Sequence, residues 1–178
     1  MTSQQITQTI LSNATRLANL HQAIEKTFAE KEKHPQDYEQ AVRLFQESYD
    51  ALAFPGGLER GIRALKQHDP ATIDVAIEYL KINPYFYRSG YIQEKILRFL
   101  KQSPLSKKQI LNVHDVILHA ITSDRPQASF REYCRLAAHL ADETLRMHIE
   151  NILRTQTEKK IIRRAQQMLE TIAQHIPT

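Results

Sequence analysis

Aromatic and basic side chains are concentrated in residues 85–91, whose sequence is YFYRSGY. Four of the thirteen tyrosine and phenylalanine residues of the chain lie there, beside an arginine. Tyrosine and arginine are enriched at the energetic centres of protein interfaces, because each combines a large contact area with a polar tip. We therefore predict that Tyr85, Tyr87, Arg88 and Tyr91 contact a partner protein.

A structural role is the alternative for the same segment. Phe86 and one or two of the tyrosines would then fill the core beside Pro84, and Ser89 would cap the next helix. Arg88 distinguishes the two interpretations. An exposed arginine is free to contact a partner, whereas a buried one must pair with a carboxylate.

Basic residues recur on the polar faces of two predicted helices, after residue 91 and after residue 158. Lys95 and Arg98 extend the predicted partner contacts. The remaining basic residues form a possible phosphate-binding set: Lys101, Lys107, Lys108, Lys159, Lys160, Arg163 and Arg164. Such rows can hold phosphates. Because Glu94 and Glu170 reduce the net positive charge of these rows, an ordinary solvated helix face is the alternative.

Catalytic and metal-binding residue types form no familiar pattern. His114 and His119 are five residues apart, which points them in different directions on a helix. Gly56, Gly57 and Gly61 lack the lysine-serine ending of a phosphate loop. Cys134 lies on an apolar helix face, where we expect a buried and inert thiol. We predict no metal and no cofactor, and we expect a protein that is not an enzyme.

Prolines divide the chain into short blocks in which apolar residues recur at helical spacing. Proline is tolerated in the first turn of a helix and breaks its interior. The dividing residues are Pro35, Pro55, Pro70, Pro84, Pro104 and Pro126. The pattern predicts an all-α protein of about nine helices, the first running from about Ser3 to about Lys33. The apolar seam of that helix comprises Ile10, Ala14, Leu17, His21, Ile24 and Phe28.

Helix starts are marked by capping residues. Asp69 is a good N-cap before Pro70, and Ser106 forms a capping box with a glutamine three residues later. Asp142 and Thr157 are expected to cap the last two helices. These signals indicate short connections, and therefore helices packed as antiparallel neighbours.

The length of 178 residues is typical of one domain. We predict a long first helix and a second helix in residues 1–54, followed by helical hairpins in 57–176. A shift of 42 positions superimposes Asn83-Pro84 on Arg125-Pro126, and Tyr91-Ile92 on Tyr133-Cys134. In helix lengths and proline placement, residues 57–176 resemble HEAT and armadillo repeat proteins. A compact helical bundle is the alternative arrangement.

The resemblance implies a curved surface that binds proteins or, less often, nucleic acids. Alkylpurine DNA glycosylases share the HEAT-like fold, but they rely on tryptophan, and this chain has none. The first 50 residues carry a net charge of −2 and the remainder +6. That excess can attract an anionic partner without approaching the charge density of a histone.

A single cysteine excludes an intrachain disulfide, and the sequence shows no secretory signal and no membrane span. We expect a cytoplasmic, non-catalytic helical module that binds another protein, such as a small bacterial adaptor, inhibitor or toxin-immunity protein. Nucleic-acid binding through the basic helix faces is the alternative. The sequence leaves the oligomeric state open.

Overall fold

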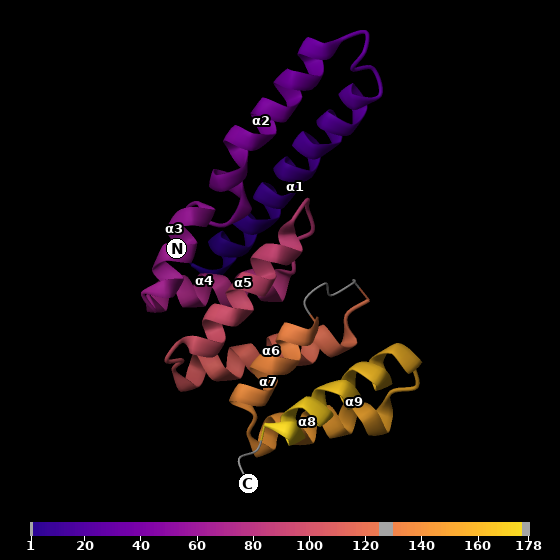
Figure 1. The fold of residues 1–178 in the computed structure, drawn as a ribbon. Coiled ribbons are helices and arrows are strands. Elements are labelled where there is room, and N and C mark those ends of the chain that lie inside the picture. Colours follow the sequence, from indigo (N-terminus) through magenta and orange to yellow (C-terminus); the bar gives the residue numbers. More distant parts are fainter. Residues whose placement is uncertain (1, 125–129, 176–178) are drawn as a thin grey trace. The chain divides into compact units, whose positions relative to one another are not determined.

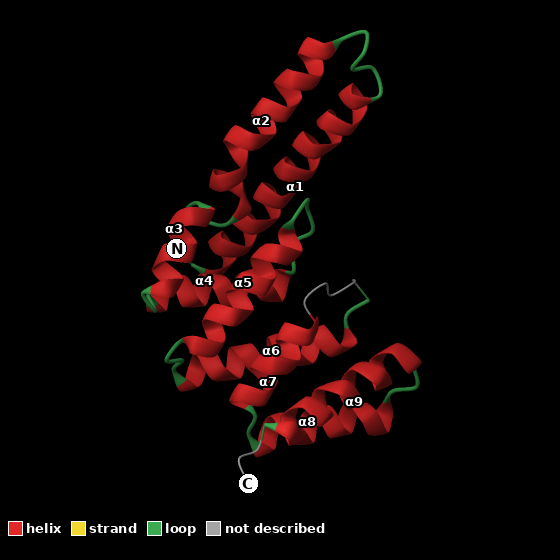
Figure 2. Cartoon of the chain, viewed as in Figure 1, coloured by secondary structure: helices red, strands yellow, loops and turns green. Residues whose placement is uncertain are grey.

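The computed structural model describes residues 2–124 and 130–175, and all regular structure in these ranges is helical (Figures 1 and 2). The helices are α1 (Ser3–Phe28), α2 (Pro35–Ala53), α3 (Leu58–Lys66), α4 (Pro70–Ile82), α5 (Ser89–Gln102), α6 (Lys107–Thr122), α7 (Phe130–Leu140), α8 (Glu143–Thr155) and α9 (Lys159–Gln174). The predicted all-α class is confirmed, and the predicted number of helices is close. Pro126, expected to open α7, lies outside the described residues.

The chain divides into two compact units, Met1–Ser89 and Gly90–Thr178. We call them the N-terminal unit and the C-terminal unit and describe each by itself. The boundary falls at the first turn of α5. The single-domain organisation and the HEAT-like stacking of hairpins stay predictions.

In the N-terminal unit, α1 and α2 form a long antiparallel hairpin, and α4 packs against the first half of α1. The loop end of this hairpin lies furthest from α3 and α4 (Figure 1). Ile10 and Leu17 of the predicted seam are buried, His21 and Ile24 are half-buried, and Phe28 is exposed. The core of this unit therefore becomes thinner toward the loop.

Helix α1 ends at Phe28 rather than at about Lys33, and residues 29–33 form turns. The run Glu30-Lys31-Glu32-Lys33 offers no apolar side chain to pack against α2. Most helical stability in proteins comes from such packing. The chain leaves the helix there, and the N–H groups of Lys33 and His34 both donate to the carbonyl of Glu30.

In the C-terminal unit, α7 and α8 pack on α9, and α6 contacts all three. The core consists of side chains that are almost fully enclosed: Val113, Ile117, Leu136, Leu145, Ile149, Ala165 and Met168. Helix α5 is linked to α7 by Arg98, whose Nε lies 3.9 Å from Oε2 of the buried Glu132.

Three of the four expected caps are formed. The Asp69 carboxylate accepts from the N–H of Thr72 at 2.8 Å, and that of Asp142 accepts from Leu145 at 2.8 Å. Ser106 and Gln109 make the reciprocal bonds of a capping box. The fourth position differs, because α9 begins after Glu158 without a side-chain cap.

Candidate protein-binding groove

A groove in the N-terminal unit brings together α1, α2 and the loop between α4 and α5. Its volume is about 480 Å³. Its lining residues are His21, Ile24, Val42, Phe45, Gln46, Tyr49, Tyr87 and Arg88. Five of the eight carry an aromatic or imidazole ring or a guanidinium group, so the groove offers flat, polarisable surfaces rather than a purely aliphatic wall.

The loop that supplies Tyr87 and Arg88 is anchored at its centre. Phe86 is only 6% exposed, and its N–H donates to the hydroxyl of Ser89 at 3.3 Å. With Phe86 held inward, its neighbours Tyr85 and Tyr87 remain on the surface, 83% and 47% exposed. Phe86 thus fills the core as the structural alternative expects, whereas the tyrosines of the segment do not.

Tyr87 is positioned by rings from the α1–α2 hairpin. It stacks on His21 with 4.6 Å between ring centroids and 15° between planes, and it meets Phe45 at 6.0 Å. The hydroxyl of Tyr49 donates to the carbonyl of Tyr87 at 3.5 Å. Aromatic contacts of this kind contribute about 0.5–1.5 kcal/mol each beyond the area they bury. The ring is therefore both exposed and held in place.

Arg88 adopts an unusual backbone conformation, with φ at +67°. The left-handed region costs a residue with a side chain about 1–2 kcal/mol. The guanidinium carbon lies 5.4 Å from the centre of the Tyr87 ring, within cation–π range. Arg88 is exposed, and it forms no ion pair with any residue that the structure describes.

Tyr49 keeps its proton under all ordinary conditions. Burial raises the pKa of its phenol, the positive charge of Arg88 opposes the rise, and Tyr87 adds to it. Tyr49 therefore lines the groove with a neutral hydroxyl, which can donate to the Tyr87 carbonyl.

Three predicted partner contacts, Tyr91, Lys95 and Arg98, belong to α5 in the C-terminal unit and do not line the groove. Tyr91 is 67% exposed, and Lys95 is exposed as well. Arg98 pairs with Glu94 one turn before it and with Glu132 of α7. Its charge is thereby compensated within the chain.

Two members of the possible phosphate-binding set serve the end of α6. Arg164 donates to the carbonyl of Ser123 at 2.7 Å, and Lys160 donates to that of Asp124 at 3.1 Å. Cations at a helix C-terminus are favoured by the helix dipole and by the unpaired carbonyl groups of the last turn. These two residues therefore have a structural role.

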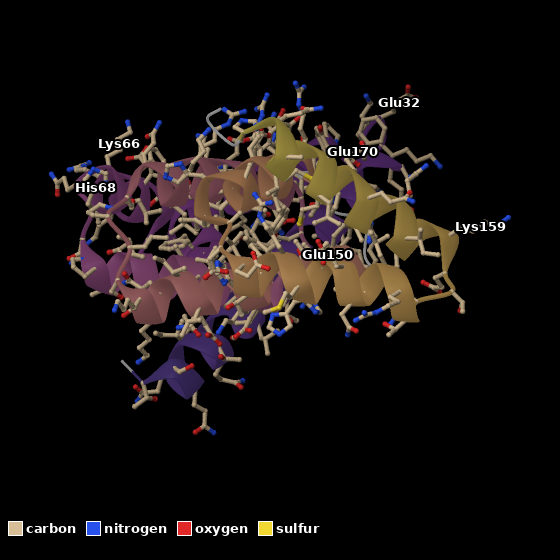
Figure 3. The ribbon with its side chains drawn as sticks, turned by 90° about the horizontal axis from the view of Figure 1, so that it is seen from below. Glu32, Lys66, His68, Glu150, Lys159 and Glu170 are labelled. Atoms are coloured by element: carbon tan, nitrogen blue, oxygen red, sulfur yellow. The ribbon has the colours of Figure 1, made fainter. Side chains whose placement is uncertain are left out.

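The other members of that set belong to α5, α6 and α9. Lys107, Lys108, Lys159 and Arg163 are exposed, and Lys159 extends away from the ribbon (Figure 3). Lys101 differs from them, because it is half-buried and lines a cavity of the C-terminal unit.

The sequence alone did not identify His21, Phe45 and Tyr49 as parts of the groove. Two signals pointed toward them: a histidine inside the apolar seam of the first helix, and aromatic residues repeated along the stripe of the second. What the sequence lacked was the pairing of these two helices with residues 87 and 88, which lie 38 or more positions after Tyr49.

The single cysteine, a potential nucleophile, is buried in the C-terminal unit. Cys134 is 1% exposed, and burial raises the pKa of its thiol to about 11, so the reactive thiolate is scarce at neutral pH. The described residues contain no cluster of three or more histidine, cysteine or acidic side chains that could hold a metal. Within the same ranges, no helix is both long enough and apolar enough to cross a membrane.

Comparison with models of known protein families, with curated proteins and with solved structures finds no match for this chain. The groove must therefore be interpreted from its own geometry.

Proposed function

We propose that the N-terminal unit binds a segment of a partner protein in the groove, and that this segment presents an apolar side chain next to a carboxylate. The observation that carries the proposal is the pair Tyr87 and Arg88. Tyr87 presents a half-exposed ring that stacks on His21. Arg88 presents an exposed guanidinium group that has no acidic partner among the described residues.

The tyrosine supports the apolar part of the proposal. Covering the exposed portion of such a ring removes about 100 Å² of apolar surface from water, which contributes about 2.5 kcal/mol. The half-buried Ile24 and Val42 extend this surface along the groove. Because His21 and Phe45 already hold the ring, binding orders few side chains and loses little entropy.

The arginine supports the carboxylate. A guanidinium pairs with a carboxylate through two parallel hydrogen bonds, which fix the orientation of the ligand as well as adding energy. The left-handed backbone at Arg88 also favours a binding role, because residues held in sparsely populated conformations are concentrated at functional sites.

Nucleic-acid binding receives less support. Of the basic residues on which it depends, Arg98 is paired with two carboxylates, and Lys160 and Arg164 cap α6. A protein partner requires none of these side chains.

The experiment is selection of peptides from a displayed library of random twelve-residue sequences on the immobilised chain. We expect enrichment of peptides that combine an aromatic or large aliphatic residue with aspartate or glutamate. Affinity for a selected peptide should fall at least about tenfold, or ~1.4 kcal/mol, in Arg88→Glu and in Tyr87→Ala. Fluorescence polarisation with the labelled peptide measures it.

Tyr85→Ala is the matched control, because this tyrosine belongs to the same loop but does not line the groove. It should bind the peptide within about twofold of the parent. Far-ultraviolet circular dichroism verifies folding, and the surface change Arg88→Glu remains informative if Tyr87→Ala proves unstable. Failure to enrich any peptide, or equal binding by the parent and Arg88→Glu, would refute the proposal.

A further inference from the structure

A second cavity, with a volume of about 630 Å³, lies in the C-terminal unit among α5, α7, α8 and the end of α9. Five of its eight lining residues are basic or imidazole side chains: Lys101, Arg135, His139, Arg146 and His175. They come from four different helices or their ends. Among the residues that the structure describes, no aspartate or glutamate lines the cavity.

One of the lining residues, Arg135, forms an ion pair with the buried carboxylate of Glu132. Glu132 is 7% exposed and pairs with Arg135 and Arg98, so one buried negative charge is shared between two guanidinium groups. It fixes the position of Arg135 and compensates part of its charge. Lys101 and Arg146 form no ion pair with any residue that the structure describes, so the cavity keeps an excess of positive charge.

Helix-end preferences explain only part of this composition. Lys101 and His139 lie in the last turns of α5 and α7, where a basic residue is favoured by the helix dipole. That preference accounts for each residue separately. It does not explain why Lys101 and His139 line the same cavity as Arg135 and Arg146. These two arginines lie outside the last turns of their helices.

The remaining walls are small and apolar. They consist of Ala138, Ala141 and the buried Ile172. At the rim, Nδ1 of His175 donates to the carbonyl of Thr171 at 3.0 Å, which leaves Nε2 as the free nitrogen of the ring. The volume lies in the range typical of small-molecule sites, in which apolar walls surround a few convergent polar groups.

We propose that this cavity binds a small organic phosphate, whose phosphate group contacts Lys101, Arg135 and Arg146 while its organic part rests on the alanine and isoleucine wall. Arginine and lysine side chains are the common ligands of phosphate in proteins, and a guanidinium can bind two phosphate oxygens at once. This site is independent of the groove in the N-terminal unit.

The charge of the whole unit supports the same class of ligand. Residues 90–178 contain fourteen lysines and arginines against nine acidic residues, whereas residues 1–89 contain ten against eleven. An excess of positive charge raises the local concentration of anions, and a concave wall concentrates the field.

The experiment is titration of the full-length, ¹⁵N-labelled chain with pyrophosphate and, separately, with adenosine diphosphate, followed by heteronuclear NMR. We expect both probes to shift the amide signals around Lys101, Arg135, Arg146 and His175. Adenosine diphosphate should bind more tightly than pyrophosphate, because its nucleoside also covers the apolar wall. Calorimetric affinity should fall at least about tenfold in Arg146→Gln and in Lys101→Gln.

Arg154→Gln, an exposed arginine on the same helix as Arg146, is the matched control and should bind within about twofold of the parent. The shift map of the unmodified chain gives a result even if a variant fails to fold. Absence of shifts at millimolar probe, or an equal loss in Arg154→Gln, would overturn the site. A 20-base-pair DNA duplex that displaces pyrophosphate from the same amides would overturn its assignment to a small molecule.

Discussion

Tyrosines of this chain take opposite roles according to their burial. Tyr79 and Tyr133 are 1% exposed, and burial raises the pKa of both phenols well above the ordinary value. Tyr85, Tyr87 and Tyr91 lie on the surface. A tyrosine brings a large apolar ring and one polar atom to either environment. The position of that single hydroxyl therefore decides whether the tyrosine stabilises the core, destabilises it, or is available to contact a partner protein.

Tyr79 shows the cost of enclosing a hydroxyl. Its oxygen is buried and has no hydrogen-bond partner among the described residues, while its ring packs 5.5 Å from that of Phe54. A buried polar group without a partner costs about 1–3 kcal/mol. We expect Tyr79→Phe to raise the free energy of unfolding by about 1 kcal/mol, measured by urea denaturation. Tyr49→Phe, which removes a bonded hydroxyl, is the control and should lower it. A loss of stability in Tyr79→Phe would contradict the prediction.

The roles of these residues could be predicted only in part. The sequence predicts Tyr87 and Arg88 as partner contacts from their types and their crowding, which are local properties. It could not separate the exposed from the buried tyrosines, because burial depends on helices that meet from distant parts of the chain. Lys160 and Arg164 illustrate the same limit, since their carbonyl partners lie 36 and 41 positions earlier.

At the scale of the helix, α3 is fixed to its neighbours by a close contact at Gly61. A methyl group placed there would lie 2.4 Å from Cδ1 of the buried Phe54. Alanine normally favours a helix over glycine by about 1 kcal/mol, whereas overpacking costs about 1–3 kcal/mol. We expect the contact to dominate, so Gly61→Ala should lower the thermal midpoint.

Differential scanning calorimetry measures this effect. Lys66→Ala on the same helix is exposed, extends away from the ribbon in Figure 3, and should leave the midpoint nearly unchanged. A higher midpoint for Gly61→Ala would show that Phe54 moves aside and that helix propensity decides the outcome.

The start of α4 depends on the ionised carboxylate of Asp69. Its pKa is lowered by hydrogen bonds from the hydroxyl and then the N–H of Thr72. A group with a lowered pKa in the folded state stabilises above its unfolded pKa of about 4, and this contribution is lost as the pH falls through the folded pKa. We expect Asp69→Ala to unfold at lower urea than the parent at pH 7, with the difference shrinking below pH 4.

Asp69→Asn is the control for that experiment. Asparagine is an equally good N-cap but carries no charge, so this variant should retain more stability than Asp69→Ala without the same dependence on pH. The prediction would be wrong if the urea midpoints of Asp69→Ala and the parent differed by the same amount from pH 7 to pH 2.5. The charge of Asp69 would then be irrelevant to the cap.

Helix starts were predicted more accurately than helix ends because caps are encoded by neighbours in sequence. Asp69, Ser106 and Asp142 each bond to a backbone N–H three residues later. The end of α1 depends instead on packing against α2, for which the run Glu30-Lys31-Glu32-Lys33 offers no apolar side chain. The sequence pattern alone extended that helix five residues too far.

At the scale of the whole molecule, the groove and the cavity proposed to bind a phosphate belong to different compact units. Each proposal can consequently fail without affecting the other. Within the N-terminal unit, the α1–α2 hairpin is joined to α4, because Phe54 packs on Tyr79 and Thr7 of α1 donates to Glu78.

The N-terminal unit has a core of its own, and we expect residues 1–89 to fold as a separate fragment. Ile10, Leu17, Leu65, Ile73 and Leu80 are each at most 2% exposed and come from three helices of this unit. A fragment of this length should unfold cooperatively with an enthalpy of about 60 kcal/mol near 60 °C. Calorimetry and far-ultraviolet dichroism of the fragment measure this, and Leu17→Asp should abolish the transition because it places a charge in the core. A helical fragment that melts without a cooperative transition would mean that the core of residues 1–89 is insufficient by itself.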